Sequence, residues 1–122
     1  MNPLNFLKDN KYTLSYFYLS LAILGAILPT ISNFHFAYEY GLAFDIKKFI
    51  ELANNNPAAE SISRDLFISA SAIFLWIINE SKKLEIKNMW IVYLGTFLIA
   101  FAFSAPLFLF LRERRIIELN EN

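Results

Sequence analysis

Few residues in this 122-residue chain have side chains and surroundings suited to chemistry. The candidates are ionisable residues beside uncharged apolar segments, where a charge is costly and therefore informative: Asp65, Arg112, Glu80 and His35. Asp65 and Glu80 are 15 residues apart, which is about 22 Å along a helix. This separation excludes a paired-carboxylate acid–base couple within one subunit.

Asp65 is the first candidate, because its nearest cation has another partner. Glu60 and Arg64 have the i,i+4 spacing of a helical ion pair. In an antiparallel arrangement of helices, Arg112 reaches the level of Asp65. We therefore predict an Asp65–Arg112 ion pair at a membrane boundary, which would either fix the helix register or bind a proton or a lipid headgroup.

Glu80 and His35 have simpler interpretations. Glu80 precedes Lys82 and Lys83, so we expect it to lie in the membrane interface and extend toward water. His35 is the only histidine and has Glu39 one helical turn away. Since zinc sites generally need three or four protein ligands, we interpret His35 as a structural interfacial residue and predict no metal and no cofactor.

Several other classes of function lack their sequence signatures. The chain has no cysteine and three isolated glycines, and its 11 basic residues balance its 11 acidic ones. These features argue against cysteine nucleophiles, glycine-rich phosphate loops and nucleic-acid binding. No GxSxG nucleophile elbow is present. Whether the protein is an enzyme stays open, and the residues favour a non-enzymatic role.

Three uncharged segments must position these residues. They cover 27 residues from Tyr12 to Tyr38, 14 from Leu66 to Asn79, and 24 from Asn88 to Leu111. A helix needs about 20 apolar residues to cross the hydrocarbon core. We predict an all-α integral membrane bundle with three transmembrane helices, at about 14–31, 62–80 and 89–111. They form a single membrane domain, 1–122, with polar tails at 1–11 and 112–122.

The middle segment is short, and its flanks extend the predicted helix. Asn56 is a suitable N-cap and Pro57 suits the first helical position, so one helix is expected from about Pro57 to Lys82. Before it, the apolar residues of 42–53 follow helical spacing on one face and the charged residues occupy the other face. This pattern predicts a short amphipathic helix in the membrane interface. The prolines at 29 and 106 are expected to end or kink their helices.

The ends of the first apolar segment bear on processing and orientation. Thr30-Ile31-Ser32 loosely imitates a signal-peptide cleavage site, but Pro29 interrupts it, so we expect the span to be retained. Lys8 and Lys11 precede the segment. The positive-inside rule therefore favours a cytoplasmic N-terminus in a multi-pass protein of the plasma (inner) membrane, although the arginines at 112–115 argue for the opposite orientation.

Five phrases, in this order and spacing, resemble a family of small bacterial integral membrane proteins classed as a domain of unknown function. They are Leu21 to Pro29, Gly41 to Phe49, Asp65 to Ser69, Glu80 with Leu84 and Trp90, and Pro106 to Arg114. The resemblance covers about residues 17–115 and implies a three-span protein. The family supplies no reaction, cofactor or ligand. The Thr30 to Asn33 stretch departs from its aromatic tendency.

Two classes of function therefore stay open. The first is a non-enzymatic membrane subunit or a self-associating helical bundle, because small residues such as Ala22, Ala26, Ala100 and Ser104 suit close helix contacts. The second is a lipid- or isoprenoid-binding membrane protein or enzyme that uses Asp65. The expected partners are membrane lipids and either a second copy or another membrane protein. A concave apolar pocket beside Asp65 would favour the second class.

Overall fold

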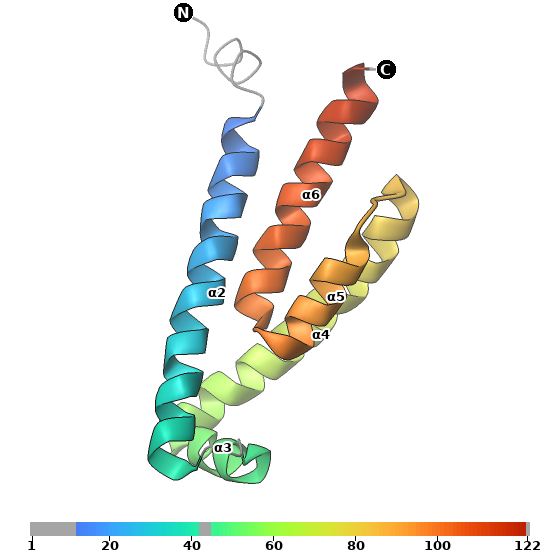
Figure 1. Ribbon diagram of the computed structural model, residues 1–122. Helices are drawn as coiled ribbons and strands as arrows, with labels where there is room; N and C mark the ends of the chain where they lie inside the picture. The colour runs from blue at the N-terminus through green and yellow to red at the C-terminus, as the bar shows by residue number, and fades with distance from the viewer. Residues whose placement is uncertain (1–11, 42–44, 122) are drawn as a thin grey trace, which may run out of the picture.

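The computed structural model describes residues 12–41 and 45–121, and this part of the chain is all-α, as predicted. The helices are α2 (Thr13–Tyr40), α3 (Ile46–Ala53), α4 (Pro57–Leu84), α5 (Met89–Leu98) and α6 (Phe101–Glu121) (Figure 1). The predicted tail at 1–11, residues 42–44 of the predicted interfacial helix and Asn122 lie outside the described residues.

Two helices, α2 and α4, are long and apolar enough to cross a membrane. Each has 28 residues, which is about 42 Å of helix and more than the roughly 30 Å of a hydrocarbon core. Helix α4 starts as predicted: the Asn56 side chain accepts a 2.9 Å hydrogen bond from the Ala59 N–H, and Pro57 follows it.

The third apolar segment does not form the continuous helix predicted over 89–111. It is divided at Ile99–Ala100 into α5 and α6, which run in opposite directions (Figure 1). Val92 of α5 and Phe108 of α6 belong to one buried cluster with Ile77 of α4. In a continuous helix, residues 16 positions apart would be about 24 Å apart. The segment is therefore a helical hairpin, and its second helix returns toward the end at which the first began.

Close contacts hold the two arms of this hairpin together. The Thr96 hydroxyl of α5 and the Ser104 hydroxyl of α6 are joined by a 2.8 Å hydrogen bond. Gly95 lies against the Phe103 ring, where a Cβ would come within 2.7 Å of a ring carbon. A small residue and a pair of hydroxyl groups therefore allow the arms to approach, as is usual between membrane helices.

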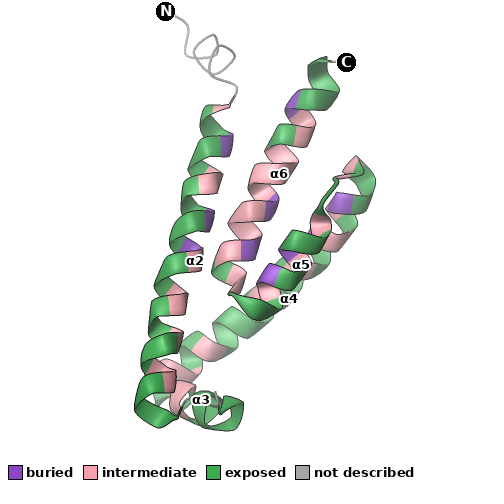
Figure 2. Cartoon of the chain, in the orientation of Figure 1, coloured by how far each residue is buried: buried purple, intermediate pink, exposed green. Residues whose placement is uncertain are grey.

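Burial is confined to the inner faces of α2, α4 and the hairpin (Figure 2). Ala22 and Ser104, two of the small residues predicted to lie at helix contacts, are 1% and 0% exposed. Large apolar side chains cover the outer surface instead, among them Phe17, Phe34 and Phe67. A soluble protein rarely exposes so extensive an apolar surface, whereas a bundle in lipid needs one.

Helix α3 is amphipathic and lies across the end of α2 and the start of α4 (Figure 1). It begins at Ile46, where the Asp45 side chain caps it by accepting a 3.2 Å hydrogen bond from the Lys48 N–H. The Phe49 ring makes an edge contact with Phe36 of α2, with centroids 5.2 Å apart. The described part of the predicted interfacial helix is therefore helical.

Both internal prolines and the charged C-terminal segment lie within helices. Pro29 and Pro106 lie inside α2 and α6 and end neither helix. The residues predicted to form a polar tail from 112 continue α6 to Glu121. Contacts between this charged part of α6 and α4, described below, explain why it is ordered as a helix.

The C-cap of α4 yields a stability prediction. Glu85 has φ = 52°, a left-handed conformation that side chains with a Cβ adopt at a cost. Glu85→Gly is therefore expected to stabilise the detergent-solubilised protein by about 1 kcal/mol, measured as a rise in thermal midpoint. The same substitution at the right-handed, exposed Lys83 should lower the midpoint, and an equal effect at both positions would contradict this explanation.

Candidate functional site

The predicted Asp65–Arg112 ion pair does not form, because the hairpin carries Arg112 to the other end of α4. Arg112 Nε donates to Glu80 Oε1 at 3.2 Å, and the two side chains are 30% and 16% exposed. The Arg112 guanidinium also lies 5.6 Å from the Trp76 ring centroid. Glu80 is thus half-buried and paired, and it does not extend freely into water as predicted.

Arg115 makes a second connection between α6 and α4. Its Nε donates to the Leu84 carbonyl oxygen at 2.8 Å, and its Nη1 donates to Glu118 at 2.9 Å. A carbonyl in the last turn of a helix lacks an intrahelical partner, so Arg115 caps α4 from another helix. These contacts place the charged part of α6 beside the α4–α5 turn.

Asp65 and His35 lie in the opposite half of the bundle, near α3. Asp65 is exposed, and no ion pair to it is present in residues 12–41 and 45–121. His35 lies 3.8 Å from Glu39, and both side chains are more than half exposed. The four candidate residues therefore do not form one site.

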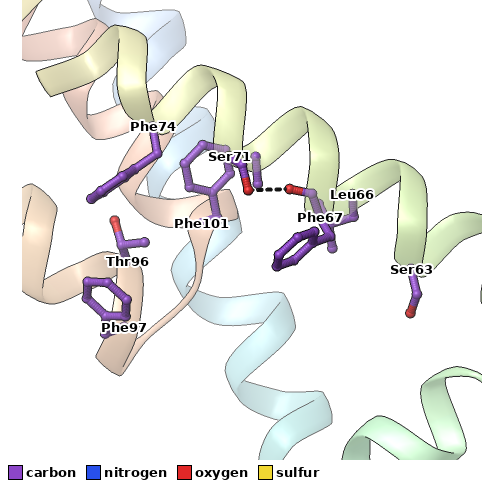
Figure 3. A pocket seen from close by; sticks show the side chains of 9 residues that line it. Ser63, Leu66, Phe67, Ser71, Phe74, Thr96, Phe97 and Phe101 are labelled. Atoms are coloured by element: carbon purple, nitrogen blue, oxygen red, sulfur yellow. Dashed lines mark hydrogen bonds between the residues drawn. The ribbon is translucent and has the colours of Figure 1, made fainter. Parts of the chain in front are cut away.

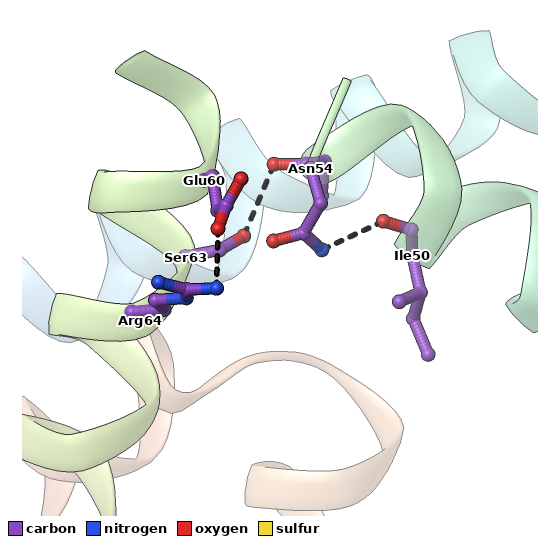
Figure 4. Close-up of polar contacts among 6 residues, drawn as sticks. Ile50, Asn54, Glu60, Ser63 and Arg64 are labelled. Carbon is purple, nitrogen blue, oxygen red and sulfur yellow. Dashed lines mark hydrogen bonds and ion pairs between the residues drawn. The ribbon is translucent and has the colours of Figure 1, made fainter. Parts of the chain in front are cut away.

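Polar contacts fix the junction between α3 and α4 close to Asp65 (Figure 4). The Asn54 side chain donates to the Ile50 carbonyl oxygen at 2.8 Å, and the Ser63 hydroxyl donates to the Ala53 carbonyl oxygen at 3.2 Å. Arg64 pairs with Glu60, as the i,i+4 spacing predicts. Of these three contacts, the Ser63–Ala53 hydrogen bond joins the two helices.

An open apolar groove of about 480 Å³ lies where the hairpin turn meets the middle of α4 (Figure 3). One wall is a single face of α4, and the other comes from the ends of α5 and α6. The lining residues are Ser63, Leu66, Phe67, Ala70, Ser71, Phe74, Thr96, Phe97 and Phe101.

The chemistry of the groove is that of an apolar binding surface. Its polar groups are three hydroxyls, and the Ser71 and Thr96 hydroxyls already donate to the Phe67 and Val92 carbonyl oxygens. Asp65 follows Ser63 by two positions, which is about 200° around the helix, so its carboxylate lies on the side of α4 away from the groove. The groove can hold an apolar chain or helix, and it presents no acid or base.

The groove was not predicted from the sequence. The α4 residues that line it recur at helical spacing from Ser63 to Phe74, a pattern visible before folding. Thr96, Phe97 and Phe101 were not predicted, because they reach the groove only through the hairpin turn. No signal in the sequence marks that turn.

The fold and the site define an all-α protein with two helices that could span a membrane, joined to a helical hairpin beside an apolar groove. The chain belongs to the family described as protein of unknown function DUF2834, which matches residues 17–114. This confirms the resemblance to a domain of unknown function. No curated protein and no solved structure matches the chain.

Proposed function

We propose that this is a multi-pass plasma (inner) membrane protein with a non-enzymatic, self-associating role, and that its hairpin is a re-entrant element. Helix α5 has ten residues, or about 15 Å of helix, which is half of a hydrocarbon core. The start of α6, directly after the hairpin turn, lies beside the middle of α2, since Gly25 lies against the backbone of Ala102. The hairpin turn therefore lies near the centre of the bilayer.

The backbone of this turn is the observation that carries the proposal. Both the Ile99 and the Ala100 N–H donate to the Gly95 carbonyl oxygen, at 3.0 Å. Within the described residues, no donor reaches the carbonyl oxygens of residues 96–99 and no acceptor reaches the N–H groups of Phe101 and Ala102. Some of these groups lack partners at any helix end, but here they lie inside the membrane.

Neither lipid nor bulk water is a suitable environment for the unpaired backbone groups of the hairpin turn. Irregular backbone in the hydrocarbon region is tolerated only where protein or a water-filled cavity covers it. Phe97 and Leu98 at the turn are each 78% exposed, and such apolar side chains do not favour a water-filled cavity. A protein surface is the remaining cover, and a second copy of the chain would supply it.

Cysteine cross-linking tests this proposal directly, because the chain has no native cysteine. Leu98→Cys in native membranes is expected to give a dimer-sized product with a bifunctional thiol reagent. Leu24→Cys is the matched control, since Leu24 is exposed beside Gly25 at the same depth. No product from Leu98→Cys, or a product with a different protein, would overturn self-association.

The distribution of charge supports an orientation for this protein. Beside the α4–α5 turn lie six basic residues: Lys82, Lys83, Lys87, Arg112, Arg114 and Arg115. The end with α3 has three: Lys47, Lys48 and Arg64. By the positive-inside rule, the α4–α5 turn faces the cytoplasm together with the start of α2 and the C-terminal part of α6.

A second candidate function is the binding of a lipid or isoprenoid chain in the groove, which its four phenylalanines favour. Asp65 lies on the other side of α4, so this candidate involves binding without catalysis by that carboxylate. Ala70→Phe would fill the groove and is expected to remove a co-purifying lipid chain, measured by mass spectrometry of organic extracts. Unchanged lipid content would count against this candidate.

A further inference from the structure

A second, polar pocket of about 240 Å³ lies between the α4–α5 turn and α6, where the apolar parts of three helices end. Its apolar lining comes from Ile86 and Leu111, and its basic lining comes from Lys87, Arg114 and Arg115. The apolar sequence of α6 stops at Leu111 and the charged sequence begins at Arg112. The pocket therefore joins an apolar surface to a cationic one.

Two of the three cations, Lys87 and Arg114, have no carboxylate partner within the described residues. The Arg114 guanidinium carbon lies 4.7 Å from the Tyr12 ring centroid and 5.9 Å from that of Phe110. Such stacking fixes a guanidinium while leaving its N–H edges available. Within residues 12–41 and 45–121, no carboxylate pairs with Arg114 or Lys87.

The remaining charges of the pocket leave an excess of positive charge. Arg115 and Glu118 neutralise each other at 2.9 Å. Glu85 also lines the pocket, so Lys87 and Arg114 against Glu85 give a net charge of +1. The Arg115 Nη2 group has no partner within the described residues, and it adds a further donor.

We infer that this pocket binds the headgroup of an anionic phospholipid, with the phosphate between Lys87 and Arg114. Guanidinium and ammonium groups form strong charge-assisted hydrogen bonds with phosphate. Basic pockets at the cytoplasmic ends of membrane helices suit anionic headgroups. The apolar lining from Ile86 and Leu111 favours a lipid over free phosphate, because Leu111 is the last residue of the apolar part of α6. The inference rests on the proposed membrane insertion and is independent of self-association.

Native mass spectrometry of the full chain released from nanodiscs tests the inference. Equal mixtures of phosphatidylglycerol and phosphatidylcholine are expected to leave phosphatidylglycerol bound in preference. Lys87→Gln/Arg114→Gln should reduce this retention roughly 25-fold, at about five-fold per cation removed. Lys47→Gln/Lys48→Gln is the matched control at the other end, and it should retain the lipid.

The other outcomes are distinguishable. Equal retention of both lipids, or equal losses in the two double variants, would overturn the inference. Displacement of the lipid by millimolar inorganic phosphate would assign the pocket to free phosphate and also overturn it. Arg114→Lys keeps the positive charge, so this variant should bind phosphatidylglycerol as the unsubstituted protein does. This result would distinguish a loss of contacts from misfolding. A chain that fails to enter nanodiscs would instead contradict the proposed membrane insertion.

Discussion

Gly25→Ala is expected to separate α2 from the hairpin and to destabilise the protein by about 3 kcal/mol, the upper end of the cost of overpacking. A Cβ at this position would overlap the Ala102 carbonyl group. Pro106 has no N–H, so the Ala102 carbonyl, four residues earlier in α6, lacks its usual helical donor. The obstacle is backbone, which cannot rotate away as a side chain can, so whole helices would have to move.

Two substitutions provide controls for Gly25→Ala in thermal unfolding of the solubilised protein. Leu24→Phe adds volume on the exposed face of the same turn and should leave the midpoint nearly unchanged. Gly95→Ala meets the Phe103 ring, which can rotate, so we expect an intermediate effect. If Gly25→Ala behaves like Leu24→Phe, α2 and α6 do not pack as described.

Glu80→Ala is expected to cost about 2 kcal/mol, the second large effect. It would leave the Arg112 guanidinium half-buried beside Trp76 without its carboxylate. Removing one partner of a fully buried pair costs about 3–5 kcal/mol, and the partial exposure here reduces that figure. Loss of this ion pair should weaken the packing of α6 against α4.

A double-mutant cycle measures this interaction. Glu80→Ala with Arg112→Ala should show a coupling free energy of more than about 1 kcal/mol. Glu60 and Arg64 form an exposed pair within α4, with Arg64 74% exposed, and the same cycle there should give a coupling of less than about 0.5 kcal/mol. Equal couplings would show that the Glu80–Arg112 pair does not join two helices.

The long helices could be predicted from the sequence because their signals are local. The uncharged segments give the apolar parts of α2 and α4, and Asn56-Pro57 gives the start of α4 to the residue. The separation of apolar and charged residues onto opposite faces of α3 likewise depends only on its own sequence.

The hairpin turn could not be predicted, because neither Ile99 nor Ala100 is a helix-breaking residue. Nothing local distinguishes the 24 uncharged residues from Asn88 to Leu111 from a continuous span. The turn depends on distant contacts, namely Gly25 against Ala102 and the cluster around Phe108. Tertiary packing therefore overrides an apolar pattern that is long enough to cross the membrane.

The error in topology explains the error in the candidate site. A third span would carry Arg112 to the level of Asp65, whereas a hairpin returns it to Glu80. Arg112 and Glu80 were both candidates, but we predicted Asp65 as the partner of Arg112, and Glu80 is the partner in the structure. Their pairing could not be derived without the direction of α6.

The side of the membrane on which the C-terminal part of α6 lies tests most directly whether α5 and α6 form a re-entrant hairpin. Single cysteines would replace Lys83, Asn120 and Asn55, all exposed, in a chain without native cysteine. They would be labelled with an impermeant maleimide in oriented membrane vesicles. The re-entrant hairpin predicts that Lys83→Cys and Asn120→Cys react from one side and Asn55→Cys from the other. Labelling of Asn120→Cys from the same side as Asn55→Cys would show a third continuous span and contradict the hairpin.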